Sequence, residues 1–137
     1  MKALEDVRKL FENDKFATEN GAVIDEIGDF YAKCSLKLTE GHKNAVGSVM
    51  GGVSFTLADF AFAVASNWQN PGVVSLSSNI TYLGTAKGER LIAEASCVKN
   101  GHTTSYYRVD VQDDLGNPVA AVTVTGYRKS VDKKIIY

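Results

Sequence analysis

The chain has 137 residues, with 15 Lys and Arg against 16 Asp and Glu, a formal net charge of -1 and 45% hydrophobic residues. This length fits one globular domain, expected over residues 1–137. The balanced charge, with no basic stripe and no apolar stretch as long as a membrane span, argues against nucleic acid or a membrane as a partner.

The N-terminal segment predicts a short helix and no export signal. Leu4, Val7, Leu10 and Phe11 recur at helical spacing with charged residues between them, which predicts an amphipathic helix that ends near Asn13. Residues 1–15 mix both charges without an apolar core, unlike a signal peptide. A cytoplasmic location is therefore expected.

The remaining elements are predicted from hydrophobic periodicity and turn residues. A long, nearly all-apolar run predicts a central helix from about Gly52 to Asn67. Strands are expected before and after it, with a hairpin at Asn100-Gly101. The predicted strands are Val23–Ile27, Phe30–Leu38, Val74–Tyr82, Leu91–Val98, Thr104–Gln112 and Val119–Arg128.

One apolar helix with about six mostly antiparallel strands implies an α+β layer fold. The helix is apolar on every side, so a curved sheet wrapped around it is expected to cover it. The two cysteines, Cys34 and Cys97, lack C-x-x-C spacing and are expected as buried thiols in a reducing compartment. The polar strand face that begins at Ser75 is expected to line a crevice or a subunit seam.

The start of the central helix holds the chemistry. Gly51 and Gly52 lie where the first free backbone N–H groups of the helix would be. Asp59 is the only ionisable residue between Val53 and Ala65, and a carboxylate in an apolar helix is expected to be buried, where it is costly unless it is paired or used. Amide donors beside an acid suit acyl chemistry.

These residues carry a resemblance. The pattern Asn44-x-x-Gly47-x-x-Met50-Gly51-Gly52-x6-Asp59, followed by an antiparallel sheet, resembles the hotdog-fold acyl-CoA thioesterases and most closely their phenylacetyl-CoA thioesterase-like branch. The resemblance covers about residues 23–128. It implies a hotdog fold, a curved antiparallel sheet around one long helix, and hydrolysis of an acyl-CoA, aryl-acyl-CoA included, to the free acid and CoA.

The resemblance also assigns roles to single residues. Asp59 matches the family acid that activates water or attacks directly, and an amide of Gly51 or Gly52 matches the donor that polarises the thioester carbonyl. Asn44 matches a residue that holds the water or nucleophile, and Ser75 matches a strand hydroxyl that orients water in some members. Substrate contacts are also expected from Gly47, Met50, Tyr82 and Lys87. Lys87 would suit a phosphate of coenzyme A, and its alternative role is that of a plain surface charge. Met50 departs from the family, which has His there.

Helix geometry adds a statement about assembly. Seven residues from Gly52 to Asp59 span about 10 Å of helix axis, whereas both groups must lie about 3 Å from one thioester. Two antiparallel helices, with Gly52 of one facing Asp59 of the other, satisfy this condition. The resemblance implies the same assembly, a homodimer with shared sites that often pairs again into a homotetramer.

Structural interpretations stand beside these roles. Asp59 could serve as a hydrogen-bonded structural acid, the glycine pair as a tight turn, Asn44 as a turn residue, and Ser75 as a structural hydroxyl. His42 and His102 are expected in solvent, and no metal site is predicted. No cofactor is needed beyond the CoA of the substrate. The alternative function is a non-catalytic acyl-CoA-binding hotdog protein that lost activity through Met50.

Overall fold

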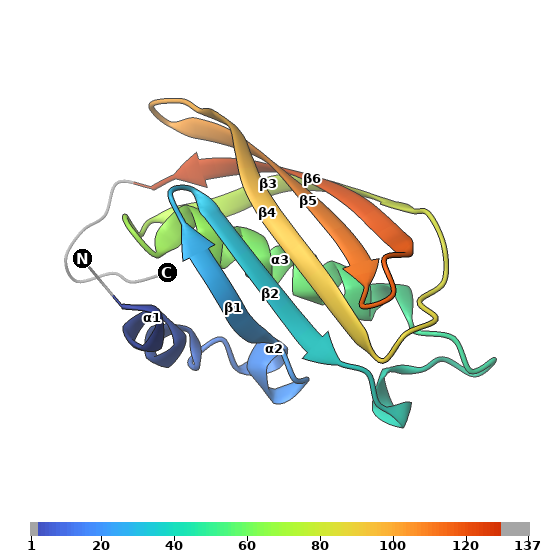
Figure 1. Cartoon of the computed structure of the whole chain (residues 1–137). Coiled ribbons are helices and arrows are strands. Elements are labelled where there is room, and N and C mark those ends of the chain that lie inside the picture. Colours follow the sequence, from blue (N-terminus) through green and yellow to red (C-terminus); the bar gives the residue numbers. More distant parts are fainter. Residues whose placement is uncertain (1–2, 130–137) are drawn as a thin grey trace.

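The computed structural model describes residues 3–129 (Figure 1). Within these residues, three α-helices, one 3-10 turn and six strands follow one another. Their order is α1 (Leu4–Phe11), α2 (Lys15–Glu19), β1 (Val23–Gly28), β2 (Tyr31–Lys37), η1 (Glu40–His42), α3 (Gly51–Asn67), β3 (Val73–Tyr82), β4 (Arg90–Asn100), β5 (Thr104–Asp113) and β6 (Pro118–Arg128).

All six strands join one antiparallel sheet in the order β1-β2-β4-β5-β6-β3. The chain leaves β2, runs through α3 and enters β3 at the far edge, so that β1 and β3 are the two edge strands. The sheet curves around α3, which crosses its inner face (Figure 1). The predicted α+β arrangement of a curved sheet around one helix is confirmed.

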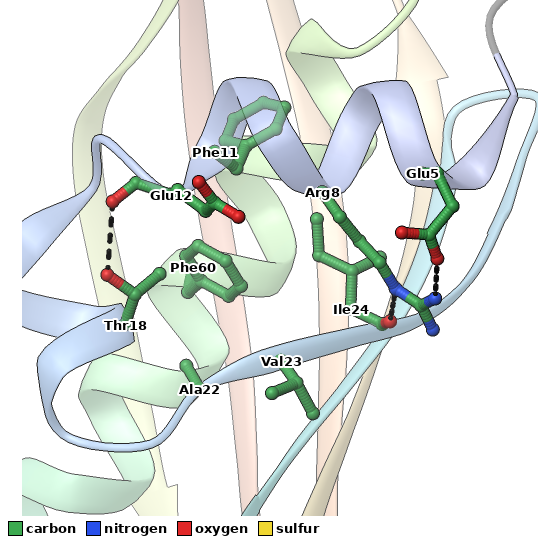
Figure 2. A pocket seen from close by; sticks show the side chains of 9 residues that line it. All are labelled: Glu5, Arg8, Phe11, Glu12, Thr18, Ala22, Val23, Ile24 and Phe60. Atoms are coloured by element: carbon green, nitrogen blue, oxygen red, sulfur yellow. Dashed lines mark hydrogen bonds and ion pairs between the residues drawn. The ribbon is translucent and has the colours of Figure 1, made fainter.

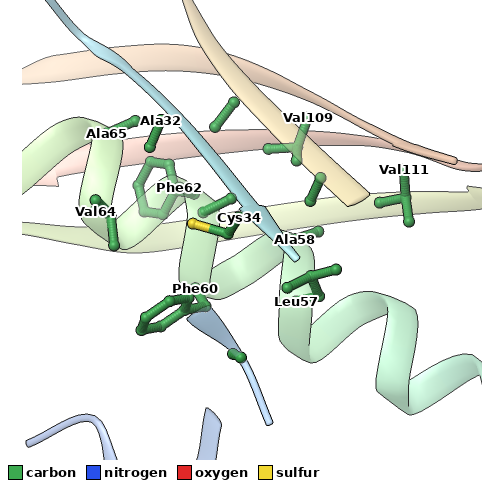
Figure 3. Packing of buried hydrophobic residues seen from close by; sticks show 14 of the residues in the cluster. Ala32, Cys34, Leu57, Ala58, Phe60, Phe62, Val64, Ala65, Val109 and Val111 are labelled. Atoms are coloured by element: carbon green, nitrogen blue, oxygen red, sulfur yellow. The ribbon is translucent and has the colours of Figure 1, made fainter. Parts of the chain in front are cut away.

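The core lies between α3 and the inner face of the sheet (Figure 3). Leu57, Ala58 and Phe62 of α3 are buried against β2 and β5, where Ala32, Cys34, Val109 and Val111 point inward. Small side chains on both layers let the helix approach the strands closely, and the large ones fill the remaining space. Strand β5 alternates buried and exposed residues along its whole length, as one covered sheet face requires.

The outer face of α3 departs from the prediction. The helix was expected to be covered on every side, but Gly52 and Asp59 are exposed, and Phe55, Thr56 and Ala63 are only partly buried. The sheet covers one side, whereas α1 and α2 reach only part of the other, where the rings of Phe11 and Phe60 meet edge to face at 6.3 Å. An open stripe therefore runs along α3 in the single chain.

Three local predictions need correction. The first helix ends at Phe11, and a separate five-residue helix, α2, follows it, which the periodicity of so short a segment did not reveal. The hairpin at Asn100 is confirmed, but residues 101–103 form its loop, with Gly101 N–H donating to the Thr104 carbonyl at 2.8 Å. Cys34 is buried as predicted, whereas Cys97 is only partly buried.

Asp113 ties two loops together at one end of the sheet. Its carboxylate is buried and accepts hydrogen bonds from the backbone N–H groups of Lys87, Gly88, Leu115 and Asn117 and from the Asn117 side chain, at 2.8–3.1 Å. Burial alone would raise the pKa of Asp113, but these donors hold it well below its ordinary value.

The Asp113→Asn variant is therefore expected to melt at least about 5 °C lower than the parent at pH 7, because the amide cannot replace the ionised acceptor. A lowered pKa stabilises the fold above the unfolded value near 3.9, and this stability disappears as the pH falls toward the folded value. Thermal melts between pH 7 and 3 should show the gap closing below about pH 4. Asp110→Asn, at an exposed ion pair with Arg108, is the control; a gap independent of pH would contradict the assignment.

Candidate active site

The N-terminus of α3 presents two free amide donors. Met50 is the extended N-cap residue, and its own N–H donates to the His42 carbonyl at 2.9 Å. The Val53 N–H donates to the Met50 carbonyl at 3.0 Å. Between them, the N–H groups of Gly51 and Gly52 donate to no other group within residues 3–129. Free amides at a helix start, with the positive end of the helix dipole, can stabilise an oxyanion.

Gly51 is required by the close approach of Tyr82. A Cβ atom at position 51 would lie 2.8 Å from Cζ of the Tyr82 ring. At Gly52 the nearest atom to a Cβ would be Met50 Cε, at 3.3 Å. Met50 and Tyr82 are more than half exposed, and Tyr82 lines a groove of about 500 Å³. The groove is lined by Val49, Gly51, Ser54, Tyr82, Leu83, Gly84, Thr85, Ala86 and Val119.

The loop before α3 is shaped by Asn44. Its Oδ1 accepts hydrogen bonds from the N–H groups of Val46 and Ser48, both at 3.1 Å. Its carbonyl accepts the N–H of Gly47, whose φ of +82° suits glycine. The side-chain oxygen of Asn44 is thus occupied by the loop, and its exposed amide nitrogen is the part that remains for a substrate or water.

Asp59 lies two helical turns beyond Gly52 on the same outer stripe of α3. It was expected to be buried; the structure instead exposes its side chain at the rim of a pocket of about 270 Å³, because α2 covers that side of the helix only in part. Enough protein surrounds the carboxylate that desolvation, and then the charge of Asp14, raise its pKa above the ordinary value. The pocket is lined by Asn13, Asp14, Lys15, Phe16, Ala17, Phe55, Thr56, Asp59 and Phe60.

Asp14 is a second carboxylate at this pocket that sequence analysis missed. It precedes α2 as its N-cap residue, yet its side chain makes no capping hydrogen bond. Desolvation raises the pKa of Asp14 as well. The sequence gives no local signal for a role of Asp14, because the missing capping hydrogen bond is visible only in the structure. With both acids ionised, Asp14 makes Asp59 a stronger base.

Replacing Asp14 by asparagine is expected to move the acid limb of the pH profile of kcat/KM to lower pH. The sign follows from the charges: removing a negative neighbour lowers the pKa of Asp59, so that its ionised form persists in more acidic solution. Activity should be followed from pH 4 to 8, with Asp6→Asn, at an exposed position on α1, as the control. An unmoved limb would show that Asp14 does not act on Asp59.

A larger pocket of about 540 Å³ lies between α1, α2 and β1 (Figure 2). Phe60 lines both this pocket and the one beside Asp59. The Arg8 guanidinium is occupied, since Nε donates to the Ile24 carbonyl at 2.9 Å and Nη1 pairs with Glu5. The lining of the larger pocket includes neither Gly51 nor Gly52 nor Asp59, whereas Asp59 lines the pocket beside α2 and Gly51 lines the groove.

The other predicted residues fall at different places. Ser75 is exposed on edge strand β3, opposite Gly126, next to a bulge in the β3–β6 register. Lys87 is exposed in the loop between β3 and β4. His102 is exposed as expected, but His42 is only 7% exposed, so its predicted place in solvent is wrong. Within one chain, neither Ser75 nor Lys87 lines the pocket of Asp59.

Within residues 3–129, no three side chains of the His, Cys, Asp or Glu type gather where they could hold a metal ion. In the same range, none of the helices combines the length and the apolar character needed to cross a membrane.

The sequence of this chain is similar to the sequences of known proteins. Residues 46–120 match the model of the Thioesterase superfamily. A putative esterase of Archaeoglobus fulgidus is 36% identical over 124 residues, which cover 90% of this chain and 80% of that protein. The acyl-coenzyme A thioesterase PaaI of Escherichia coli is 30% identical over 120 residues, or 87% of this chain and 86% of PaaI.

Solved structures give the same result. The structure of the E. coli PaaI protein, from the phenylacetic acid degradation operon, superposes with a TM-score of 0.85 and 26% identity over 93% of this chain and 97% of that one. A hypothetical thioesterase of Streptococcus pneumoniae, solved with coenzyme A, superposes with a TM-score of 0.79 and 25% identity over 87% of this chain and 96% of that one. The resemblance drawn from the loop–helix pattern is confirmed.

Proposed function

Because this chain belongs to the thioesterase superfamily, we propose that it hydrolyses acyl-CoA thioesters with Asp59 as the acid–base group and the Gly51 and Gly52 amides as oxyanion donors. Hydrolysis of acyl-CoA is the activity named for its E. coli relative. The observation that carries the assignment is the pair of amides at the start of α3 that have no acceptor within residues 3–129, two turns before an acid with a raised pKa.

The reaction follows from these groups. Ionised Asp59 takes a proton from water, whose oxygen attacks the thioester carbonyl carbon. The carbonyl oxygen becomes an oxyanion, and the free amides of α3 stabilise it where the charge develops. When the C–S bond breaks, the sulfur leaves with the electron pair and receives the proton held by Asp59. The products are the free acid and CoA, and Asp59 is ionised again. Direct attack by the Asp59 carboxylate is the second route.

Two copies of the chain complete one site in this proposal. Gly52 and Asp59 lie seven residues apart, about 10 Å along α3, and both are exposed on its outer stripe. Edge strand β3 leaves one side unpaired and exposes Ser75 and Leu76, the latter 61% exposed. Pairing of β3 with a second β3 would cover this edge and bring two α3 helices face to face. We therefore assign a homodimer, with a homotetramer as its further assembly.

The groove at Gly51 continues toward a polar pocket of about 270 Å³, with which it shares Val49, Thr85 and Ala86. Lys43 and Lys87 line that pocket; Lys43 pairs with Glu40 at 3.2 Å, and Lys87 forms no ion pair within residues 3–129. With the thioester carbonyl bound at the α3 amides, the pantetheine arm would lie along the groove. The CoA phosphates would then lie near the Lys87 ammonium group. The same loop is held by Asp113 through the Lys87 N–H.

Lys87→Gln is expected to raise KM for an acyl-CoA about tenfold and to leave kcat within about twofold, because the phosphates are remote from the bond that breaks. The matching acyl-pantetheine, which lacks the nucleotide, should show no change in KM. Lys99→Gln, at an exposed position near the opposite end of β4, is the control. Equal KM for CoA and pantetheine esters in the parent protein would instead favour a carrier-protein substrate.

The acyl group would lie beside Asp59, where Phe16, Phe55 and Phe60 line the pocket. Phe16 is 74% exposed in the single chain, which favours an apolar acyl group, aryl included, that would cover it. Met50, 57% exposed beside the amides, adds a flexible apolar wall in place of the family histidine. The non-catalytic alternative is not favoured, because the amide donors and Asp59 do not depend on the side chain at position 50.

A direct assay tests the proposal. Purified protein is incubated with acetyl-, hexanoyl-, decanoyl- and phenylacetyl-CoA, and released CoA is measured with a thiol reagent. We expect hydrolysis well above the uncatalysed rate in the parent protein and a rate at least about a hundredfold lower in Asp59→Asn. Binding of acyl-CoA in a thermal-shift assay without release of thiol would refute the enzyme and support the binding protein. We propose a cytoplasmic location, supported by free Cys34 and Cys97.

A further inference from the structure

His42 is a buried histidine outside the Asp59 pocket and the groove at Gly51. Its Nε2 lies 2.8 Å from the Asn20 carbonyl, which can only accept, so Nε2 carries the proton. Its Nδ1 lies 3.0 Å from the Thr39 backbone nitrogen, whose N–H can only donate, so Nδ1 is unprotonated. The partners therefore define one neutral tautomer with both ring nitrogens occupied.

Through these bonds His42 joins three segments of the chain. Asn20 follows α2 and precedes β1, and Thr39 follows β2. The backbone carbonyl of His42 accepts the Met50 N–H at 2.9 Å, directly before α3. A side chain fixed at both ends thus holds the carbonyl that meets the N-cap of the catalytic helix.

This contact lies directly before the free amides of α3. The His42 carbonyl accepts the N–H of Met50, and the next two amides, those of Gly51 and Gly52, donate to no group within residues 3–129. We propose that His42 is a positioning residue. Its ring, hydrogen-bonded through both nitrogens, sets the direction of the Gly51 and Gly52 amides toward the developing oxyanion. This inference rests on the proposed function, because it acts through the same amides.

Asparagine and glutamine separate the two ring contacts. The oxygen of Asn in His42→Asn can accept the Thr39 N–H in place of Nδ1, but it loses the bond to Asn20. The amide nitrogen of Gln in His42→Gln can reach the Asn20 carbonyl in place of Nε2, but it loses the acceptor for Thr39. The same changes at His102, the exposed second histidine, are matched controls.

The experiment measures kcat and KM for an acyl-CoA in both His42 variants, per folded protein as determined by near-UV circular dichroism. Misplaced amides lose contacts made in the transition state, so we expect kcat to fall ten- to a hundredfold and KM to stay within about twofold. The His102 variants should match the parent. If one His42 variant does not fold, the other carries the test, since each retains one ring contact.

A second readout does not depend on activity. The ¹⁵N–¹H resonances of Gly51 and Gly52 should shift in the His42 variants and not in the His102 variants. Unchanged kcat with unchanged glycine resonances would overturn the inference. A parent protein without thioesterase activity would overturn the proposed function, and the glycine resonances would then still decide whether His42 positions the amides.

Discussion

Replacing Asp59 by asparagine lowers acyl-CoA hydrolysis at least about a hundredfold, the scale for loss of a general base. Asparagine keeps the size of the side chain but cannot take a proton from water or attack the carbonyl. The substitution should not unfold the protein, because Asp59 is exposed in the single chain and its pKa is raised by its surroundings, so that its charge does not stabilise the fold. Single-turnover rates with phenylacetyl-CoA would measure the loss.

Asp6→Asn serves as the matched control for this variant. Asp6 is an exposed carboxylate on the outer side of α1 and lines neither the Asp59 pocket nor the groove at Gly51. It should turn over substrate at the parent rate. If the Asp59 variant also turned over substrate at the parent rate, with the melting temperature preserved, Asp59 would not be the catalytic acid and would have the alternative, structural role.

The second large effect is complementation between two inactive variants. Gly52→Pro removes one N–H donor at a position in the first helical turn, where proline is tolerated, and loss of one oxyanion donor costs about 10²–10³ in kcat. Asp59→Asn removes the acid. If Gly52 of one subunit faces Asp59 of the other, a mixed dimer holds one site with both defects and one intact site.

An equimolar mixture, unfolded and refolded together, should then recover about a quarter of the parent activity, since half of the dimers are mixed and each has one intact site. The same protein refolded separately and combined afterwards is the control for subunit exchange. Gly52→Ala, which keeps the N–H, should remain active. A mixture as inactive as its components would place Gly52 and Asp59 in the same subunit's site, and Gly51→Pro would test the neighbouring amide by the same scheme.

Most elements of the fold could be predicted, because their signals are local. Strand β5 alternates apolar and polar residues, and α3 is a long apolar run without an internal glycine, so each pattern predicts its own structure. The five-residue α2 was not predicted, because a helix of about one and a half turns is too short to show a hydrophobic periodicity. The burial expected for Asp59 was wrong for another reason. The hydropathy of a helix does not show how much of the helix surface is covered by the rest of the same chain.

The candidate site divides in the same way. The sequence by itself determined that Gly51, Gly52 and Asp59 share one helix, with the amides at its start and the acid two turns on, and 3.6 residues per turn place Gly52 and Asp59 on one stripe. Only the tertiary structure decided what surrounds that stripe. Three residues outside α3 contribute to the site: Asp14 beside Asp59, Tyr82 against Gly51, and His42 at the N-cap. Such contacts depend on how α2, β3 and the loop before α3 pack, and no local pattern encodes them.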